Sequence, residues 1–199
     1  MHATVPIPSW NSQGLLPPVD RANPVCPNRS PYPVKLTDVI LRFNTSADRQ
    51  SILSGFLGYR AALHAAGLTV GFQWLNGSFV EHIEIGERRR APADVDVVTF
   101  YRLPAGMTQQ ALVDRYPELF PGDRNGLQAL KSRYKVDAYT VHLGLGSERL
   151  VDRSAYWSGV WGHQRDTFTW KGFLQIDLAS IEDADARALL ALVPTEETP

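Results

Sequence analysis

Proline is concentrated at the start of the chain, and this limits what the first segment can form. Eight of the 14 prolines precede residue 34, in VPIPSWNSQGLLPPVDRANPVCPNRSPYP. Proline fixes its own φ angle, lacks an N–H donor and pushes the preceding residue toward extended geometry, which disfavours both a helix and a central strand. We therefore expect a Pro-rich extended arm over residues 1–36, with GLLPP pinning it onto a single domain over residues 37–199.

The pattern after residue 36 is typical of helices that alternate with strands. Apolar residues recur at helical spacing in some segments and alternate with polar residues in others. Helices are expected over 37–43 with Thr37 as N-cap, 46–67, 107–120 with a break near Pro117, 123–134, 154–165 and 180–193 with Ser180 as N-cap. Strands are expected over 68–75, 93–103, 134–145 and 170–178. This order predicts a mixed α/β (α+β) fold, in which helices flank a mixed sheet.

Size, charge and cysteine content exclude several classes of protein. The 199 residues, 44% of them hydrophobic, suffice for one buried core. A net charge of −1 argues against a surface that coats nucleic acid through excess cations. Cys26 is the only cysteine, so no internal disulfide and no cysteine-based zinc site can form. The first residues do not resemble a signal peptide and no apolar run is long enough to span a bilayer, so we expect a cytoplasmic protein without membrane insertion.

Two aspartates separated by one valine are the main chemical signal in the sequence. On a strand, Asp94 and Asp96 point to one face while Val95 and Val97 point to the other. Two carboxylates about 7 Å apart repel each other unless a cation lies between them, and Mg²⁺ prefers oxygen ligands. Asp137, in the later strand segment YKVDAYTV, is the natural third carboxylate.

A glycine-serine turn precedes this strand. Gly77 would let the backbone approach a phosphate closely, and the Ser78 hydroxyl could donate to its oxygens. The alternative is a solvated strand face with no ligand. The order turn, paired aspartates and later aspartate favours the metal and phosphate interpretation.

These residues resemble the polymerase-beta-type nucleotidyltransferase superfamily. More closely, NSQGLLPP, WLNGSFV, PADVDVV, YKVDAYTV and the later YW…R…KGFLQIDL resemble a family of small bacterial nucleotidyltransferase-like proteins of unassigned function. The likeness runs from the arm to the last strand. It implies a polymerase-beta-like fold and a nucleotidyltransferase activity.

The resemblance also implies roles for single residues. Gly77 and Ser78 would hold the triphosphate of an NTP or dNTP, and Asp94 and Asp96 would bind two Mg²⁺ (or Mn²⁺) ions. Asp137 would complete the second metal site and help activate an acceptor hydroxyl. Small bacterial enzymes of this kind often act in anti-phage defence or in toxin–antitoxin pairs. A partner effector or toxin protein, a nucleic-acid or oligonucleotide acceptor and a homo-oligomer therefore stay open as partners.

Cationic residues elsewhere admit two interpretations. Arg165 and Lys171 flank a strand start, where they would either contact the triphosphate or form structural ion pairs. The Arg88–Arg90 run would either touch phosphates or form a solvated loop, and the solvated loop is favoured.

Other residues are better explained by structure than by chemistry. Trp157 and Trp161, one helical turn apart, are more often a core pair than a base-stacking pair. Gly144–Glu148 is expected to be a loop, and Glu81 and Glu84 are not included among the metal ligands. The second functional hypothesis is a protein that binds a nucleotide or a partner without turnover.

Overall fold

The computed structural model describes residues 3–85 and 89–192. Its helices are α1 (Leu36–Phe43), α2 (Ala47–Ala65), α3 (Gln109–Arg115), α4 (Arg124–Tyr134), α5 (Ser147–Trp161) and α6 (Asp183–Leu192). Its strands are β1 (Tyr32–Pro33), β2 (Gly71–Asn76), β3 (Val95–Tyr101), β4 (Val136–His142) and β5 (Leu174–Asp177). The mixed α/β class predicted from the sequence is confirmed.

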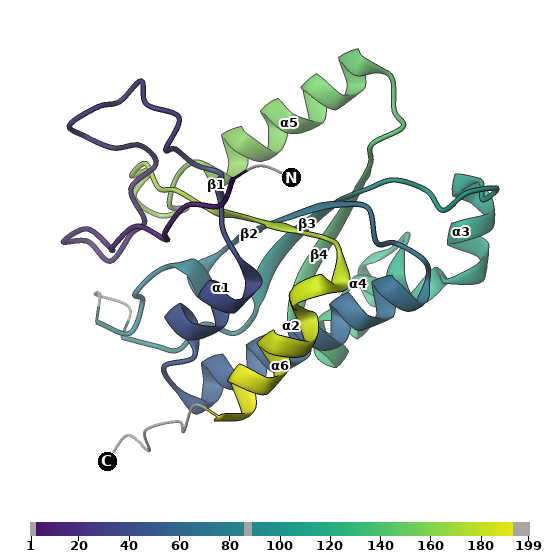
Figure 1. Ribbon diagram of the computed structural model, residues 1–199, viewed down its shortest axis with the longest axis horizontal. Coiled ribbons are helices and arrows are strands. Elements are labelled where there is room, and N and C mark those ends of the chain that lie inside the picture. Colours follow the sequence, from purple (N-terminus) through teal and green to yellow (C-terminus); the bar gives the residue numbers. More distant parts are fainter. Residues whose placement is uncertain (1–2, 86–88, 193–199) are drawn as a thin grey trace.

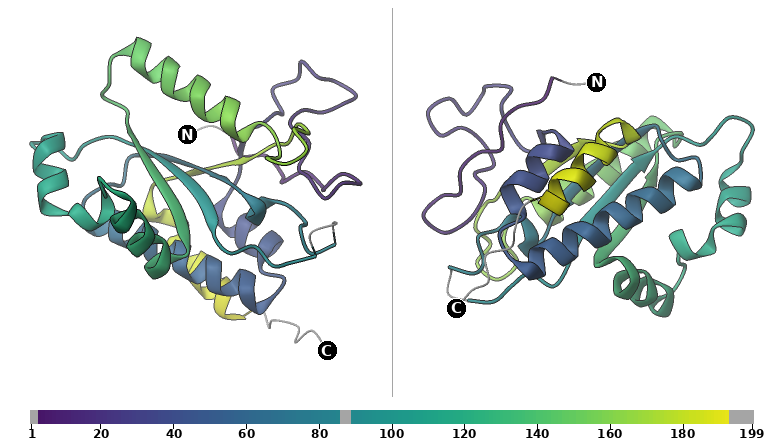
Figure 2. Two further views of the ribbon diagram at one scale, coloured as in Figure 1. Left: turned by 180° about the vertical axis from the view of Figure 1, so that it is seen from behind. Right: turned by 60° about the horizontal axis from the view of Figure 1, so that its bottom comes forward.

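The five strands form one mixed sheet in the order β1-β5-β2-β3-β4. β2 is antiparallel to both β3 and β5, whereas β3 and β4 are parallel and are joined through α3 and α4. Helices α1, α2, α4 and α6 lie on one side of the sheet and α5 on the other (Figures 1 and 2). The sheet therefore has two covered faces with separate apolar clusters.

Side-chain alternation along β3 assigns each residue to one of these faces. Val95 and Val97 are buried in the larger cluster, with α1, α2, α4 and α6. Val98 and Phe100 belong to the smaller cluster, which contains Trp157 of α5. Because side chains alternate along a strand, even-numbered positions of β3 face α5.

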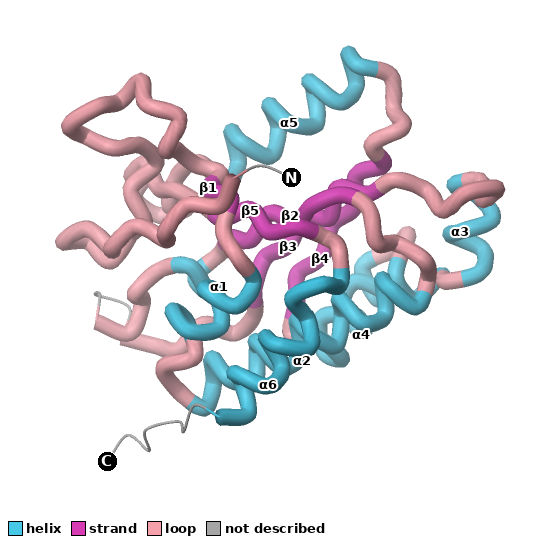
Figure 3. Tube along the Cα trace, viewed as in Figure 1, coloured by secondary structure: helices cyan, strands magenta, loops and turns pink. Residues whose placement is uncertain are grey.

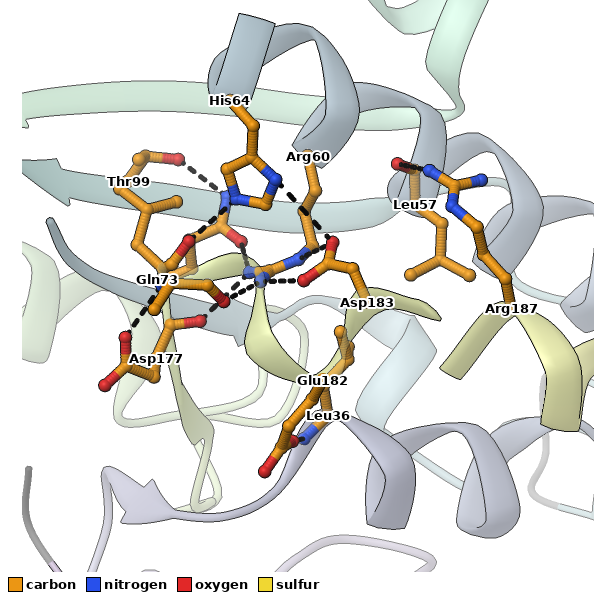
Figure 4. Close-up of polar contacts among 12 residues, drawn as sticks. Leu36, Leu57, Arg60, His64, Gln73, Thr99, Asp177, Glu182, Asp183 and Arg187 are labelled. Carbon is orange, nitrogen blue, oxygen red and sulfur yellow. Dashed lines mark hydrogen bonds and ion pairs between the residues drawn. The ribbon is translucent and has the colours of Figure 1, made fainter. Parts of the chain in front are cut away.

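Buried arginines tie the helical layer to the sheet. Arg60 of α2 donates from Nε and Nη2 to the two carboxylate oxygens of Asp183 (2.9 and 2.6 Å) and from Nη1 to Gln73 Oε1 of β2 (2.7 Å). Gln73 then donates to the Thr99 hydroxyl of β3 (3.0 Å). Figure 4 shows this network between α2, the sheet and the start of α6.

The arm is an ordered part of the fold. Leu15 and Leu16 are fully buried, and the Leu16 carbonyl accepts a hydrogen bond from the Gly172 amide (2.7 Å). Two residues of the arm, Tyr32 and Pro33, add the edge strand β1 parallel to β5. Figure 3 shows these loop segments gathered at the β1 edge of the sheet. None of the helices in the described ranges has the length and apolar character that a membrane crossing requires.

Several predicted element ends are wrong because distant parts of the chain intervene. Thr37 is not the N-cap of α1: the helix begins at Leu36, whose amide donates to the Glu182 carboxylate from the other end of the chain (2.6 Å). Ser180 is not an N-cap either, since Ser180–Glu182 is a short 3₁₀ turn and α6 begins at Asp183.

Further boundaries also differ from the prediction. Strand β2 begins at Gly71 and not at residue 68, because the Leu68 amide still bonds to the Leu63 carbonyl at the end of α2 (3.0 Å). Strand β5 begins at Leu174, because the Lys171 and Gly172 amides bond outside the sheet. Helix α5 begins at Ser147, inside the segment expected to be a loop.

Candidate functional site

The pairing of β3 with β4 brings two of the predicted carboxylates together. Asp96 and Asp137 are direct partners in the parallel register. Both lie at alternating positions that face α5, and Asp94 precedes Asp96 by two residues on the same side. Asp94 lies just before β3 and not on the strand as predicted, so two strand carboxylates and one from the preceding loop face one region of the surface.

The glycine-serine turn lies against this group. Asn76, the last residue of β2, pairs with Asp96, and Gly77 follows with a φ of 79°. A Cβ atom placed on Gly77 would lie 2.8 Å from Asp96 Oδ2. Glycine is thus required twice, once by the left-handed backbone and once by the close Asp96 carboxylate.

We expect Gly77→Ala to lower the free energy of unfolding by about 2–3 kcal/mol, from backbone strain and from displacement of Asp96. Gly106→Ala is the matched control, because Gly106 has a φ of 76° but open space around its Cβ direction. Urea unfolding of both variants separates the two effects. Equal losses in the two variants would show that the Asp96 contact contributes nothing.

The predicted site residues line a single cavity of about 640 Å³. Its walls include Gly77, Ser78, Asp94, Asp96, Asp137, Arg165 and Lys171, together with Asn76, Glu81, Arg90, Lys131, Val160, Trp161, His163 and Asp166. Of the arginine run, Arg88 lies outside the described residues, while Arg89 and Arg90 are exposed.

The carboxylates perturb one another's protonation. Burial, together with the negative charges of Asp94 and Asp137, raises the pKa of Asp96 to about 6. Burial, the charge of Asp137 and a hydrogen bond to it raise the pKa of the Tyr139 hydroxyl to about 12. The site is therefore short of positive charge around Asp96 and Asp137.

Lys131 of α4 supplies part of that charge, although no sequence pattern predicts a lysine at this site. Its ammonium group forms an ion pair with Asp94, and a hydrogen bond to Asp94 raises the pKa of Lys131. Within residues 3–85 and 89–192, no three His, Cys, Asp or Glu side chains stand in an arrangement ready to hold a metal ion. The donor set of three carboxylates fits Mg²⁺ in its chemistry, with Lys131 as the competing cation beside Asp94.

Lys131→Met is expected to raise the affinity for Mn²⁺ about tenfold, since it removes a cation that competes for Asp94. Titration calorimetry or Mn²⁺ electron paramagnetic resonance measures this affinity directly. Lys131→Arg keeps the charge and should bind as the wild type does. Weaker binding by Lys131→Met would mean that the ammonium group supports the site and does not compete with the ion.

Lys171 is in an ion pair in the structure. Its buried ammonium group donates to Glu81 Oε1 (2.6 Å) and to the Gly77 carbonyl (3.2 Å). It therefore fixes the glycine-serine turn, and Glu81, excluded from the metal ligands on sequence grounds, helps to position this turn. Glu84 pairs with buried Arg49, whose guanidinium also holds the carbonyls of the same segment.

Arg165 and the tryptophan pair fall in different environments. Arg165 is exposed at the wall of the cavity, where a phosphate could reach it. Trp157 and Trp161 are buried in the smaller apolar cluster, so the core interpretation of this pair is confirmed. Trp161 also accepts a hydrogen bond at its carbonyl from the buried Asn76 amide (3.1 Å).

Together, the fold and the site define a mixed α/β protein with an acidic cavity that opens at one end of the central strands. The chain belongs to a family of unknown function, DUF6932, whose model matches residues 8–177. The matched segment covers the glycine-serine turn and all three aspartates. Searches of curated proteins and of solved structures find no match for this chain.

Proposed function

We propose that the protein is a metal-dependent nucleotidyltransferase with a polymerase-beta-like arrangement of its site. The supporting observation is the register of β3 and β4, which puts Asp96 beside Asp137 while Gly77 packs against the Asp96 carboxylate. A turn after one strand, paired aspartates at the start of its antiparallel neighbour and a third aspartate on the next parallel strand form the order that the sequence resemblance implies.

In this proposal the chain's own residues orient the reactants. The turn at Gly77 and Ser78 holds the triphosphate, with Arg165 available to its outer oxygens. Asp94, Asp96 and Asp137 hold Mg²⁺ or Mn²⁺, which when bound supplies positive charge to the reacting phosphate. Lys171 and Glu81 keep the turn in place.

The reaction is an in-line displacement at the α-phosphate. The acceptor hydroxyl oxygen forms a bond to the α-phosphorus, the bond from the α-phosphorus to the bridging oxygen breaks, and pyrophosphate leaves. In this proposal Asp137 accepts the hydroxyl proton. Its proximity to the Tyr139 hydroxyl gives this carboxylate a second polar neighbour on the same strand face.

The biological role is proposed by analogy with small bacterial enzymes of this type. The product would be a nucleotide or oligonucleotide signal in anti-phage defence, or a nucleotide attached to a partner toxin by an antitoxin-type enzyme. A partner or a second copy would supply what a chain of this size lacks for holding a large acceptor.

A second candidate is a protein that binds a nucleotide without turnover. The Lys131–Asp94 ion pair favours it, because an internal cation lowers the need for a bound metal ion. Under this alternative the cavity holds a nucleotide through the turn and the cations alone.

Incubation with each NTP and dNTP, labelled at the α-phosphate, in Mg²⁺ or Mn²⁺ tests the proposal. Transfer of label to protein, to an oligonucleotide or to a second nucleotide, with release of pyrophosphate, is the expected result. Asp137→Asn should abolish the transfer while leaving the fold intact. Nucleotide binding without pyrophosphate release from any of the eight substrates, with these acceptors supplied, would favour the binding protein.

A further inference from the structure

A short hairpin between α5 and β5, here called the aromatic hairpin (residues 162–171), projects beside the cavity. The Gln164 amide donates to the Thr169 carbonyl (2.8 Å) and the Phe168 amide to the Gln164 carbonyl (2.9 Å). The Lys171 amide closes the base of the hairpin onto the Gly162 carbonyl (3.0 Å). Backbone hydrogen bonds therefore hold this segment in a defined shape.

The hairpin displays aromatic side chains to solvent. Phe168 is 74% exposed and Trp170 is 71% exposed. Phe168 also has a φ of 54°, an uncommon and strained value for a bulky residue. The exposed rings do not contribute to the core, and the strained backbone at Phe168 adds a cost to folding. Exposed apolar residues and strained backbone are both common at binding sites.

The aromatic hairpin continues the wall of the cavity. His163 lines the cavity, and its ring stacks on Phe168 with centroids 5.4 Å apart and an interplanar angle of 18°. Trp170 pairs with His163 across an antiparallel bridge. His163 thus connects the cavity wall to the exposed rings of Phe168 and Trp170, which lie just beyond the residues that line the cavity.

Glu81 couples this hairpin to the glycine-serine turn. One carboxylate oxygen accepts from Lys171, which also bonds to the Gly77 carbonyl, and the other accepts from the Gln164 side chain (3.0 Å). The base of the hairpin and the turn are therefore fixed to the same buried group. A ligand with an anionic end at the turn and an aromatic end at the hairpin would meet two surfaces in a fixed relation.

Two arginines of the cavity fit the anionic end of such a ligand. Arg165, on the hairpin itself, and Arg90 both line the cavity and are exposed. Arginine recognises phosphate through its planar fork, and nucleobases stack on exposed aromatic rings. We propose that the aromatic hairpin is the nucleobase-binding platform for the incoming nucleotide, with Phe168 and Trp170 as the stacking residues.

This inference rests on the proposed function, since it assumes that the triphosphate lies at Gly77 and Ser78. It names what that function leaves open, the part of the protein that contacts the base. Stacking tolerates all four bases, so we expect little discrimination among them from this platform alone.

Binding of each NTP and of inorganic tripolyphosphate, measured by titration calorimetry in Mg²⁺, tests the platform. Phe168→Ala and Trp170→Ala should each weaken NTP binding about tenfold and leave tripolyphosphate binding unchanged. Tyr156→Ala, an exposed aromatic residue on α5, is the matched control and should bind NTP as the wild type does. Circular dichroism confirms that each variant is folded.

Unchanged NTP affinity in both hairpin variants would overturn the platform while leaving the proposed transferase intact. Equal weakening of NTP and tripolyphosphate would also overturn it, because the hairpin would then act on the phosphates. If instead the variants weaken only the binding of a single-stranded oligonucleotide, the rings serve the acceptor and the assignment to the incoming nucleotide is wrong. If the hairpin variants weaken NTP binding as expected but the wild type releases no pyrophosphate, the platform stands and only the transferase activity is contradicted.

Discussion

Arg60→Met is expected to lower the free energy of unfolding by about 3–5 kcal/mol, the cost of breaking a buried ion pair by removing one partner. The guanidinium is fully buried and reaches Asp183, Gln73 and the carbonyls of Asp177 and Ala179. Methionine keeps most of the volume but leaves each of these acceptors without its donor. Chemical denaturation followed by circular dichroism measures the loss.

An exposed arginine provides the control for this effect. Arg153→Met on α5 should change the free energy of unfolding by less than about 0.5 kcal/mol. A loss below about 1 kcal/mol for Arg60→Met would show that the network is not needed to hold α2 and α6 on the sheet.

Asp96→Asn is expected to stabilise the metal-free protein while strongly lowering the proposed transferase activity. Burial raises the pKa of Asp96 in the folded protein to about 6, above the ordinary 3.8. The native state therefore holds this proton more tightly than the unfolded chain does. Well below pH 3.8 both states are protonated and the carboxyl has no effect on stability. As the pH rises from there to about 6, the ionised carboxylate increasingly destabilises the folded state, and above pH 6 this cost stays at about 3 kcal/mol.

The gain in stability from Asp96→Asn should follow the same pH course. It should be absent near pH 3.5, grow between about pH 4 and 6, and reach about 3 kcal/mol at pH 7.5 without divalent ions. The proposed nucleotidyl transfer should fall about 10³-fold at the same time, because the proposal makes Asp96 a ligand of the metal ion. Asp152→Asn, at an exposed position on α5, should alter neither quantity. A destabilised Asp96→Asn at pH 7.5 would show that the carboxylate is structurally satisfied.

The strand pattern was sufficient to predict which residues share a face. The alternation of Asp94, Val95, Asp96 and Val97 assigns the valines to the core, and the structure confirms that both are buried. The face on which Asp137 lies does not follow in this way, because Val136 and Ala138 on one face and Tyr139 and Val141 on the other are all largely apolar. What alternation cannot give is the register between two strands joined through α3 and α4, and this register is what makes Asp96 the partner of Asp137.

Residues that act through long-range contacts were not predictable. Lys131 reaches Asp94 only because α4 packs where it does, and no local pattern marks that lysine. Glu81 joins Lys171 to Gln164 across more than 80 positions of sequence. The start of α1 depends in the same way on the Glu182 carboxylate, so no local capping signal reveals it.

Anomalous diffraction from crystals grown with Mn²⁺ and a non-hydrolysable nucleoside triphosphate examines the proposed site most directly. The proposal predicts a manganese peak bound by the Asp96 and Asp137 carboxylates, with the triphosphate along Gly77 and Ser78. A nucleotide bound elsewhere on the molecule, or a bound nucleotide with no manganese at these carboxylates, would contradict it.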